Sequence, residues 1–131
     1  MKIIALFFLS LLFTTAAFAD NFVLENQTSY PAQKSKMAVQ WATSAKEVDE
    51  VNKAWLTGLK LNPETLQMLT QTGKINLSIP SKAEYFRVIV WSKGEGEPDF
   101  LTNWVEIVPN KTYTLETAHL IPAVLMPGSG C

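Results

Sequence analysis

Histidine and cysteine are almost absent from this chain, which has one of each, His119 and Cys131. A single cysteine excludes an internal disulfide and a cysteine-based zinc site. His119 has no second histidine at metal-ligand spacing, so we expect a polar residue at a strand end rather than a metal ligand. For Cys131 two readings stay open: a free thiol on the chain end, or a disulfide to another chain in an oxidising compartment.

Motifs that carry common enzyme chemistry are also missing. The sequence has no G-x-S-x-G, no G-x-G-x-x-G and no H-E-x-x-H pattern. Charges are nearly balanced, with a net charge of −1, and no basic stripe is present that could neutralise a phosphate backbone. We therefore expect no catalytic residues, no cofactor, no metal and no nucleic-acid partner.

Long apolar runs are confined to the N-terminus. Lys2 precedes an apolar stretch over residues 3–13, and Ala17-Phe18-Ala19 places small residues before Asp20. This pattern predicts a secretory signal peptide over residues 1–19, cleaved before Asp20. The apolar stretch is short for a membrane span, which needs about 20 residues. We expect residues 20–131 to form one domain, periplasmic or secreted, in a Gram-negative bacterium, without a membrane span.

Strand patterns are abundant in the rest of the chain. Apolar residues alternate with polar ones in several short runs, which is typical of half-buried strands. Residues 84–92 are apolar on both faces, which predicts a strand covered on each side. Pro122 and Pro127 limit the last run to an edge strand or an extended segment. The expected strands are 21–26, 36–43, 74–80, 84–92, 100–108, 112–118 and part of 120–128.

Two helix signals lie between the second and third of these strands. Ser44 and Glu47 form a capping-box pattern, followed by apolar residues at helical spacing up to Gly58. Asn62-Pro63-Glu64 is a second start signal, and Gly73 supplies a stop. The sequence therefore predicts an α+β fold that is mainly β: a small antiparallel β-sandwich or sheet of about six strands, with a two-helix insertion.

An acidic loop is the most distinctive polar feature. The stretch KGEGEPD places Glu95, Glu97 and Asp99 at alternate positions between two apolar runs. Glycine and proline in the same stretch are turn formers, so a hairpin tip is the simplest interpretation. A weak calcium site is the alternative, because carboxylates and loop carbonyls are the ligands that calcium prefers.

Tryptophans flank this acidic loop on both sides. Trp91 precedes it and Trp104 follows it. If both rings face outward at one end, they form a platform for a sugar ring or for an apolar side chain of a partner. Otherwise they pack under the helices. The predicted binding residues are Trp91, Trp104, Glu95, Glu97 and Asp99.

Three functions remain open from the sequence. The first is an exported, non-catalytic binding protein with an extracytoplasmic protein, glycan or membrane partner. The second is a small secreted hydrolase or cation-dependent enzyme, with an acid of the loop or His119 as its acid or base. The third is a carrier of a small apolar ligand between the helix pair and the sheet.

Overall fold

The computed structural model describes residues 20–56 and 61–123. The signal peptide predicted over 1–19, the helix end predicted at Gly58 and the thiol of Cys131 lie outside these residues. Within the described ranges, every helix is too short or too polar to cross a membrane.

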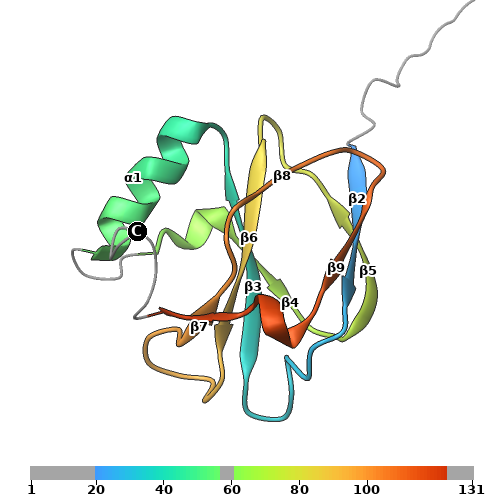
Figure 1. Cartoon of the computed structure of the whole chain (residues 1–131), viewed down its shortest axis with the longest axis vertical. Helices are drawn as coiled ribbons and strands as arrows, with labels where there is room; N and C mark the ends of the chain where they lie inside the picture. Colours follow the sequence, from blue (N-terminus) through green and yellow to red (C-terminus); the bar gives the residue numbers. More distant parts are fainter. Residues whose placement is uncertain (1–19, 57–60, 124–131) are drawn as a thin grey trace, which may run out of the picture.

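The described residues form two β-sheets and one α-helix (Figure 1). The larger sheet has the strand order β10-β7-β6-β3-β4, with β8 also paired to β6, and the smaller has the order β5-β2-β9. All pairs are antiparallel except β2 with β9. The elements are β2 (Asn21–Asn26), β3 (Lys36–Ala42), α1 (Ala45–Leu56), η3 (Pro63–Thr65), β4 (Leu66–Leu69), β5 (Gly73–Ser78), β6 (Tyr85–Trp91), β7 (Phe100–Leu101), β8 (Val105–Glu106), β9 (Thr112–Leu115), η4 (Thr117–His119) and β10 (Ile121–Pro122).

Strand β6 lies near the centre of the larger sheet and is covered on both faces, as its sequence predicts. Its side chains alternate between two layers, because successive residues of a strand point to opposite faces. Phe86, Val88 and Val90 face the smaller sheet, whereas Ile89 packs with Trp55 of α1. Figure 1 shows α1 on one side of β3 and β6, and β2, β5 and β9 on the other.

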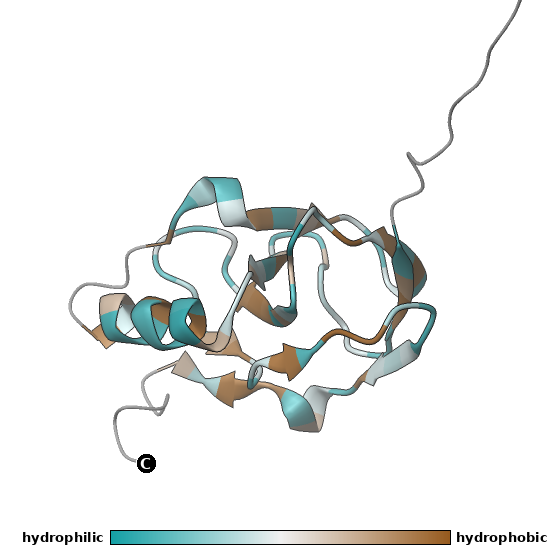
Figure 2. Ribbon diagram, turned by 90° about the horizontal axis from the view of Figure 1, so that it is seen from above, coloured by the Kyte–Doolittle hydropathy of each residue, from teal (hydrophilic) through white to brown (hydrophobic). Residues whose placement is uncertain are grey.

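The main hydrophobic core fills the space between the two sheets. Phe22 is its aromatic centre, with ring centroids 4.8 Å from Phe86 and 5.2 Å from Tyr113. In Figure 2 helix α1 is mostly hydrophilic in colour, and brown segments lie on the strands. The buried members of this core are Phe22, Leu24, Met37, Val39, Trp41, Leu69, Leu77, Phe86, Val88, Val90 and Leu115.

Helix α1 confirms the first helix prediction and refines its cap. The Ser44 hydroxyl accepts a hydrogen bond from the Glu47 backbone N–H at 3.0 Å. The Glu47 carboxylate accepts from the Thr43 backbone N–H, one residue earlier than the capping box predicts. The first bond satisfies an N–H of the first helical turn, which helix geometry leaves unpaired.

The predicted second helix is wrong. Asn62 does cap a turn, since its side chain accepts from the Glu64 backbone N–H, but that turn is the short 3-10 helix η3. The next residues form β4, which pairs with β3 and places Leu69 opposite Met37. An isolated helix of this length is marginal in water, whereas pairing with β3 satisfies the backbone and buries Leu69. The insertion is therefore one helix followed by an edge strand.

A bulge separates β7 from β8, where the sequence predicts one strand over 100–108. Leu101 lies opposite Ile89 and Val105 lies opposite Phe86, so three residues face two on β6. The Thr102 hydroxyl accepts the Val88 backbone N–H at 3.0 Å and keeps the ladder bonded. One extra residue redirects the following side chain, and Trp104 lies over the α1 face.

Arg87 is the only arginine in the chain, and its side chain is 1% exposed beneath α1. Its guanidinium carbon lies 4.5 Å from the ring centroid of Trp104 and 5.5 Å from that of Trp55. Nε donates to Gln40 Oε1 at 2.7 Å and Nη1 donates to Asn52 Oδ1 at 3.4 Å. Within the described residues Nη2 has no hydrogen-bond partner and the cation has no carboxylate partner.

The buried charge of Arg87 is stabilised by two tryptophan rings and by two side-chain amide oxygens. Burial lowers the pKa of Arg87 to about 10, so the guanidinium stays charged at neutral pH. Asn52 Oδ1 also accepts from Trp104 Nε1 at 3.1 Å. The Arg87 cluster, defined as Arg87, Gln40, Asn52, Trp55 and Trp104, therefore ties α1 and the bulge to the sheet.

Replacing Arg87 with lysine should lower the free energy of unfolding by about 2–4 kcal/mol. A compact ammonium lacks the planar fork that reaches Gln40 and Asn52 and stacks between the rings. Urea unfolding at pH 7 measures the change. The double variant Arg87→Met with Gln40→Leu should recover part of the loss, because it removes the charge and one orphaned acceptor together. An Arg87→Lys variant within 0.5 kcal/mol of the parent, roughly the scatter of surface substitutions, would contradict this.

Candidate functional site

The acidic loop is closed by Asp99. Its carboxylate accepts from the Ser92 backbone N–H at 2.8 Å and from the Ser92 hydroxyl. The Asp99 backbone N–H donates to the Val90 carbonyl at 3.0 Å. Burial, the largest single effect, raises the pKa of Asp99, but the hydrogen bonds from Ser92 and the charge of Lys93 lower it. On balance the pKa of Asp99 lies below its ordinary value of 3.8. Asp99 thus joins the two ends of the loop.

The other two acids of the loop, Glu95 and Glu97, are exposed. Among the described residues no group of three or more His, Cys, Asp or Glu side chains could hold a metal ion. No hydrogen bond or ion pair described here joins these acids to His119. The arrangement fits a hairpin tip, held by Asp99 at its base.

Gly94 is required by a close approach inside this loop. Its φ is +77°, and a Cβ built on it would lie 1.9 Å from the Lys34 carbonyl oxygen. Gly96 has a similar φ of +75° but open space around it. Substituting alanine at Gly96 would therefore cause backbone strain only, whereas alanine at Gly94 would add a steric collision with Lys34.

We expect Gly94→Ala to lower the free energy of unfolding by about 3 kcal/mol or more, because backbone must move away from Lys34. Gly96→Ala should cost only about 1 kcal/mol, the strain of a left-handed alanine. Denaturant unfolding of both variants checks this. Equal losses in the two variants would show that the loop does not pack on Lys34.

The lowered pKa of Asp99 predicts a pH-dependent contribution to stability. Its stabilisation is complete above the unfolded pKa and is lost as pH falls through the lower folded value. Asp99→Asn should cost about 1 kcal/mol at pH 7, after allowing for solvent screening, and the difference from the parent should shrink below about pH 4. Urea unfolding at several pH values measures it. Glu97→Gln is the control and should change little, and a pH-independent Asp99→Asn difference would refute the carboxylate's role.

The two tryptophans of the predicted platform lie in different settings. Trp104 stacks on Arg87 and donates to Asn52. Trp91 lies at the far end of β6, beside the acidic loop, and is half-buried. The structure therefore brings Trp91 together with Glu95 but assigns Trp104 to the Arg87 cluster.

Trp91 forms one wall of an open hollow of about 320 Å³. Strand β4 supplies Leu66 and Met68, and Met68 is 50% exposed. Lys36 and Glu95 add one charge of each sign at the rim. We call this the Trp91 hollow, and its lining residues are Lys36, Leu66, Met68, Trp91, Gly94, Glu95 and Gly96.

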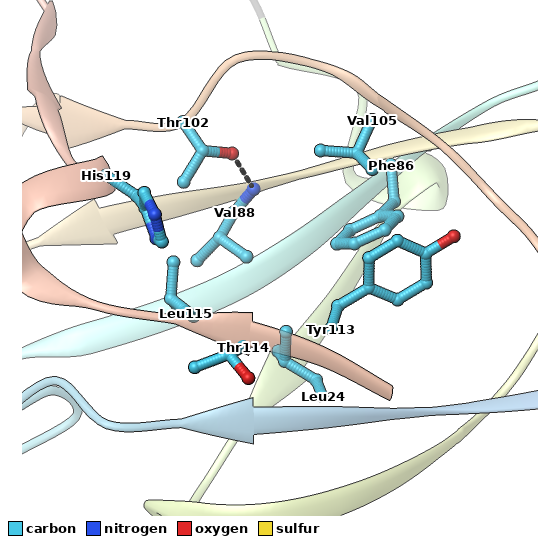
Figure 3. A pocket seen from close by; sticks show the side chains of 9 residues that line it. All are labelled: Leu24, Phe86, Val88, Thr102, Val105, Tyr113, Thr114, Leu115 and His119. Carbon is cyan, nitrogen blue, oxygen red and sulfur yellow. Dashed lines mark hydrogen bonds between the residues drawn. The ribbon is translucent and has the colours of Figure 1, made fainter. Parts of the chain in front are cut away.

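A second cavity, of about 210 Å³, lies between the two sheets. Figure 3 shows its side chains converging from both sheets, with His119 of η4 at one end and Tyr113 at the other. We call it the intersheet pocket. Its lining is mainly apolar and consists of Leu24, Phe86, Val88, Thr102, Val105, Tyr113, Thr114, Leu115 and His119.

Two hydroxyls in the lining of the intersheet pocket are already bonded to backbone. Thr102 accepts from the Val88 N–H and donates to the Asn103 carbonyl. The Tyr113 hydroxyl accepts from the Val108 N–H at 2.7 Å and donates to the Glu106 carbonyl at 2.8 Å. Both therefore leave the interior of the pocket apolar.

The intersheet pocket is not predicted by the sequence. Strand alternation identifies Leu24, Val88 and Leu115 as inward-facing, but it does not say whether facing layers meet or leave space. The sequence predicts a strand over 112–118, whereas β9 ends at Leu115 and η4 follows, so no local signal marked the pocket.

The sequence matches no known family, no curated protein and no solved structure. Its function is therefore inferred from its own residues.

Proposed function

We propose that this chain is an exported, non-catalytic binding protein that holds a small apolar ligand in the intersheet pocket. The observation that carries this is a cavity of about 210 Å³ with a mainly apolar lining. Export rests on the predicted signal peptide over residues 1–19. The sequence suggested a ligand site between the helix pair and the sheet. The site proposed here lies between the two sheets instead.

The chemistry of the polar groups supports binding over catalysis. Asp99 is occupied by Ser92, and the Nδ1 atom of His119 accepts the Glu116 backbone N–H at 3.0 Å. An acid or base needs a reacting group within hydrogen-bond reach. Here the two exposed acids of the hairpin loop, Glu95 and Glu97, lie outside the pocket, and the pocket lining contains no carboxylate.

Pocket size sets the scale of the ligand. An apolar cavity of about 150 Å³ is known to hold benzene, so this one suits a single ring with a short substituent or a short alkyl chain. Burying six carbon groups at about 0.8 kcal/mol each gives roughly 5 kcal/mol. That corresponds to a dissociation constant of a few tenths of a millimolar, which suits reversible carriage of a small molecule.

Filling the pocket should abolish binding without unfolding the protein. We expect Val105→Phe to leave the stability within about 1 kcal/mol, because the ring enters existing space instead of a packed core. The same variant should lose binding of α-methylstyrene, measured by ligand-observed NMR and by thermal shift.

Val23→Phe is the matched control, since Val23 is another half-buried strand valine outside the pocket lining. It should keep α-methylstyrene binding. A ligand at ten times its dissociation constant adds about 1.4 kcal/mol, a shift of several degrees in Tm. Equal binding by Val105→Phe and the parent would refute the pocket as the site.

The Trp91 hollow supports a second candidate, recognition of a glycan. A half-buried tryptophan that lines a hollow offers its ring face for stacking on a sugar. The charged side chains of Lys36 and Glu95 at the rim are suited to hydrogen bonds with sugar hydroxyls. This retains the site predicted from the sequence for Trp91 and Glu95 and leaves out Trp104, which the Arg87 cluster uses.

Trp91→Ala should weaken binding of any glycan found by array screening about tenfold or more. Val108→Ala removes an exposed apolar side chain elsewhere and should leave glycan binding unchanged. Affinity is measured by isothermal titration, with a thermal melt of each variant. Undiminished glycan binding by a folded Trp91→Ala protein would exclude the hollow.

A further inference from the structure

We propose that the ligand of the intersheet pocket carries an oxygen acceptor at one end, which binds the Nε2–H of His119. This rests on the proposed function, because it defines the ligand of the same pocket. The ligand class is a small molecule with an apolar body and one carbonyl-type oxygen. His119 then orients the ligand and distinguishes it from a plain hydrocarbon of the same shape.

The tautomer of His119 follows from its hydrogen bond. Nδ1 accepts the Glu116 backbone N–H at 3.0 Å, so it carries no proton in the neutral ring. The proton is therefore on Nε2, which makes Nε2 a donor. Within the described residues no acceptor is bonded to Nε2, and the ring lies at one end of the pocket lining (Figure 3).

No other lining group competes for this role. Thr102 and Tyr113 each donate to a backbone carbonyl, and the Tyr113 hydroxyl points away from Val88 in Figure 3. Thr114 lies between Tyr113 and Leu115 on β9, whose side chains pack in the core. Strand alternation turns the Thr114 side chain to the outer face. His119 is exposed and borders the pocket, so it is left as the polar group at the pocket entrance that orients a ligand.

A pair of isosteric probes tests the donor. Acetophenone and α-methylstyrene have the same shape, and only acetophenone has an oxygen acceptor where the other has a methylene. The dissociation constant of each is measured by NMR titration with the purified protein. The ratio of the two constants cancels the apolar contacts that both probes share.

Two substitutions of His119 separate its two nitrogens. His119→Asn keeps an acceptor near Nδ1 for the Glu116 N–H and removes the Nε2 donor. His119→Gln places an amide donor near Nε2. We expect His119→Asn to weaken acetophenone relative to α-methylstyrene by about three- to tenfold, and His119→Gln to restore most of the preference. Thr114→Val is the control and should leave the ratio unchanged.

The outcomes distinguish this inference from the proposed function. If both probes bind and His119→Asn leaves the ratio unchanged, the His119 donor is excluded while the pocket stands. A ratio that falls in Thr114→Val instead also excludes it. If neither probe binds the parent protein, the pocket itself is not a site and the proposed function fails with it.

Discussion

The charge of Arg87, stacked between Trp55 and Trp104 and hydrogen-bonded to Gln40 and Asn52, sets the layout of this protein. A buried guanidinium is costly unless its donors and its charge find partners. Helix α1 supplies Trp55 and Asn52, and the bulge after β7 supplies Trp104. The cation therefore requires both α1 and the bulge on one face of β6. These two elements cover that face.

Alternation along β6 transfers this constraint to the other face. Since Arg87 points toward α1, its neighbours Phe86 and Val88 must point toward the smaller sheet. There β9 pairs in parallel with β2 over only four residues, and the chain then turns into η4. Tyr113 and Leu115 of β9 and His119 of η4 line the intersheet pocket together with Val88. The intersheet pocket thus lies beside the end of β9, where the chain continues into η4.

Local patterns in the sequence predicted much of this fold, and long-range contacts account for the remainder. The alternation of Phe22 and Leu24 and the double coverage of residues 84–92 were visible in the sequence and are confirmed. The spacing of Leu66 and Leu69 predicts one face of a helix. Pairing with β3 overrides it, and in β4 the two side chains pack in different layers. The single extra residue that turns Trp104 onto Arg87 has no local signature. The pocket depends on how two sheets meet, which periodicity does not record.

Xenon binding is the most direct test of the central claim that an apolar cavity lies between the two sheets. Xenon enters dry apolar cavities without needing a specific hydrogen bond. A crystal of the protein under xenon pressure should show one xenon atom in contact with Val88, Val105 and Leu115. A structure in which side chains of the two sheets fill this space, with no xenon between them, would contradict the account.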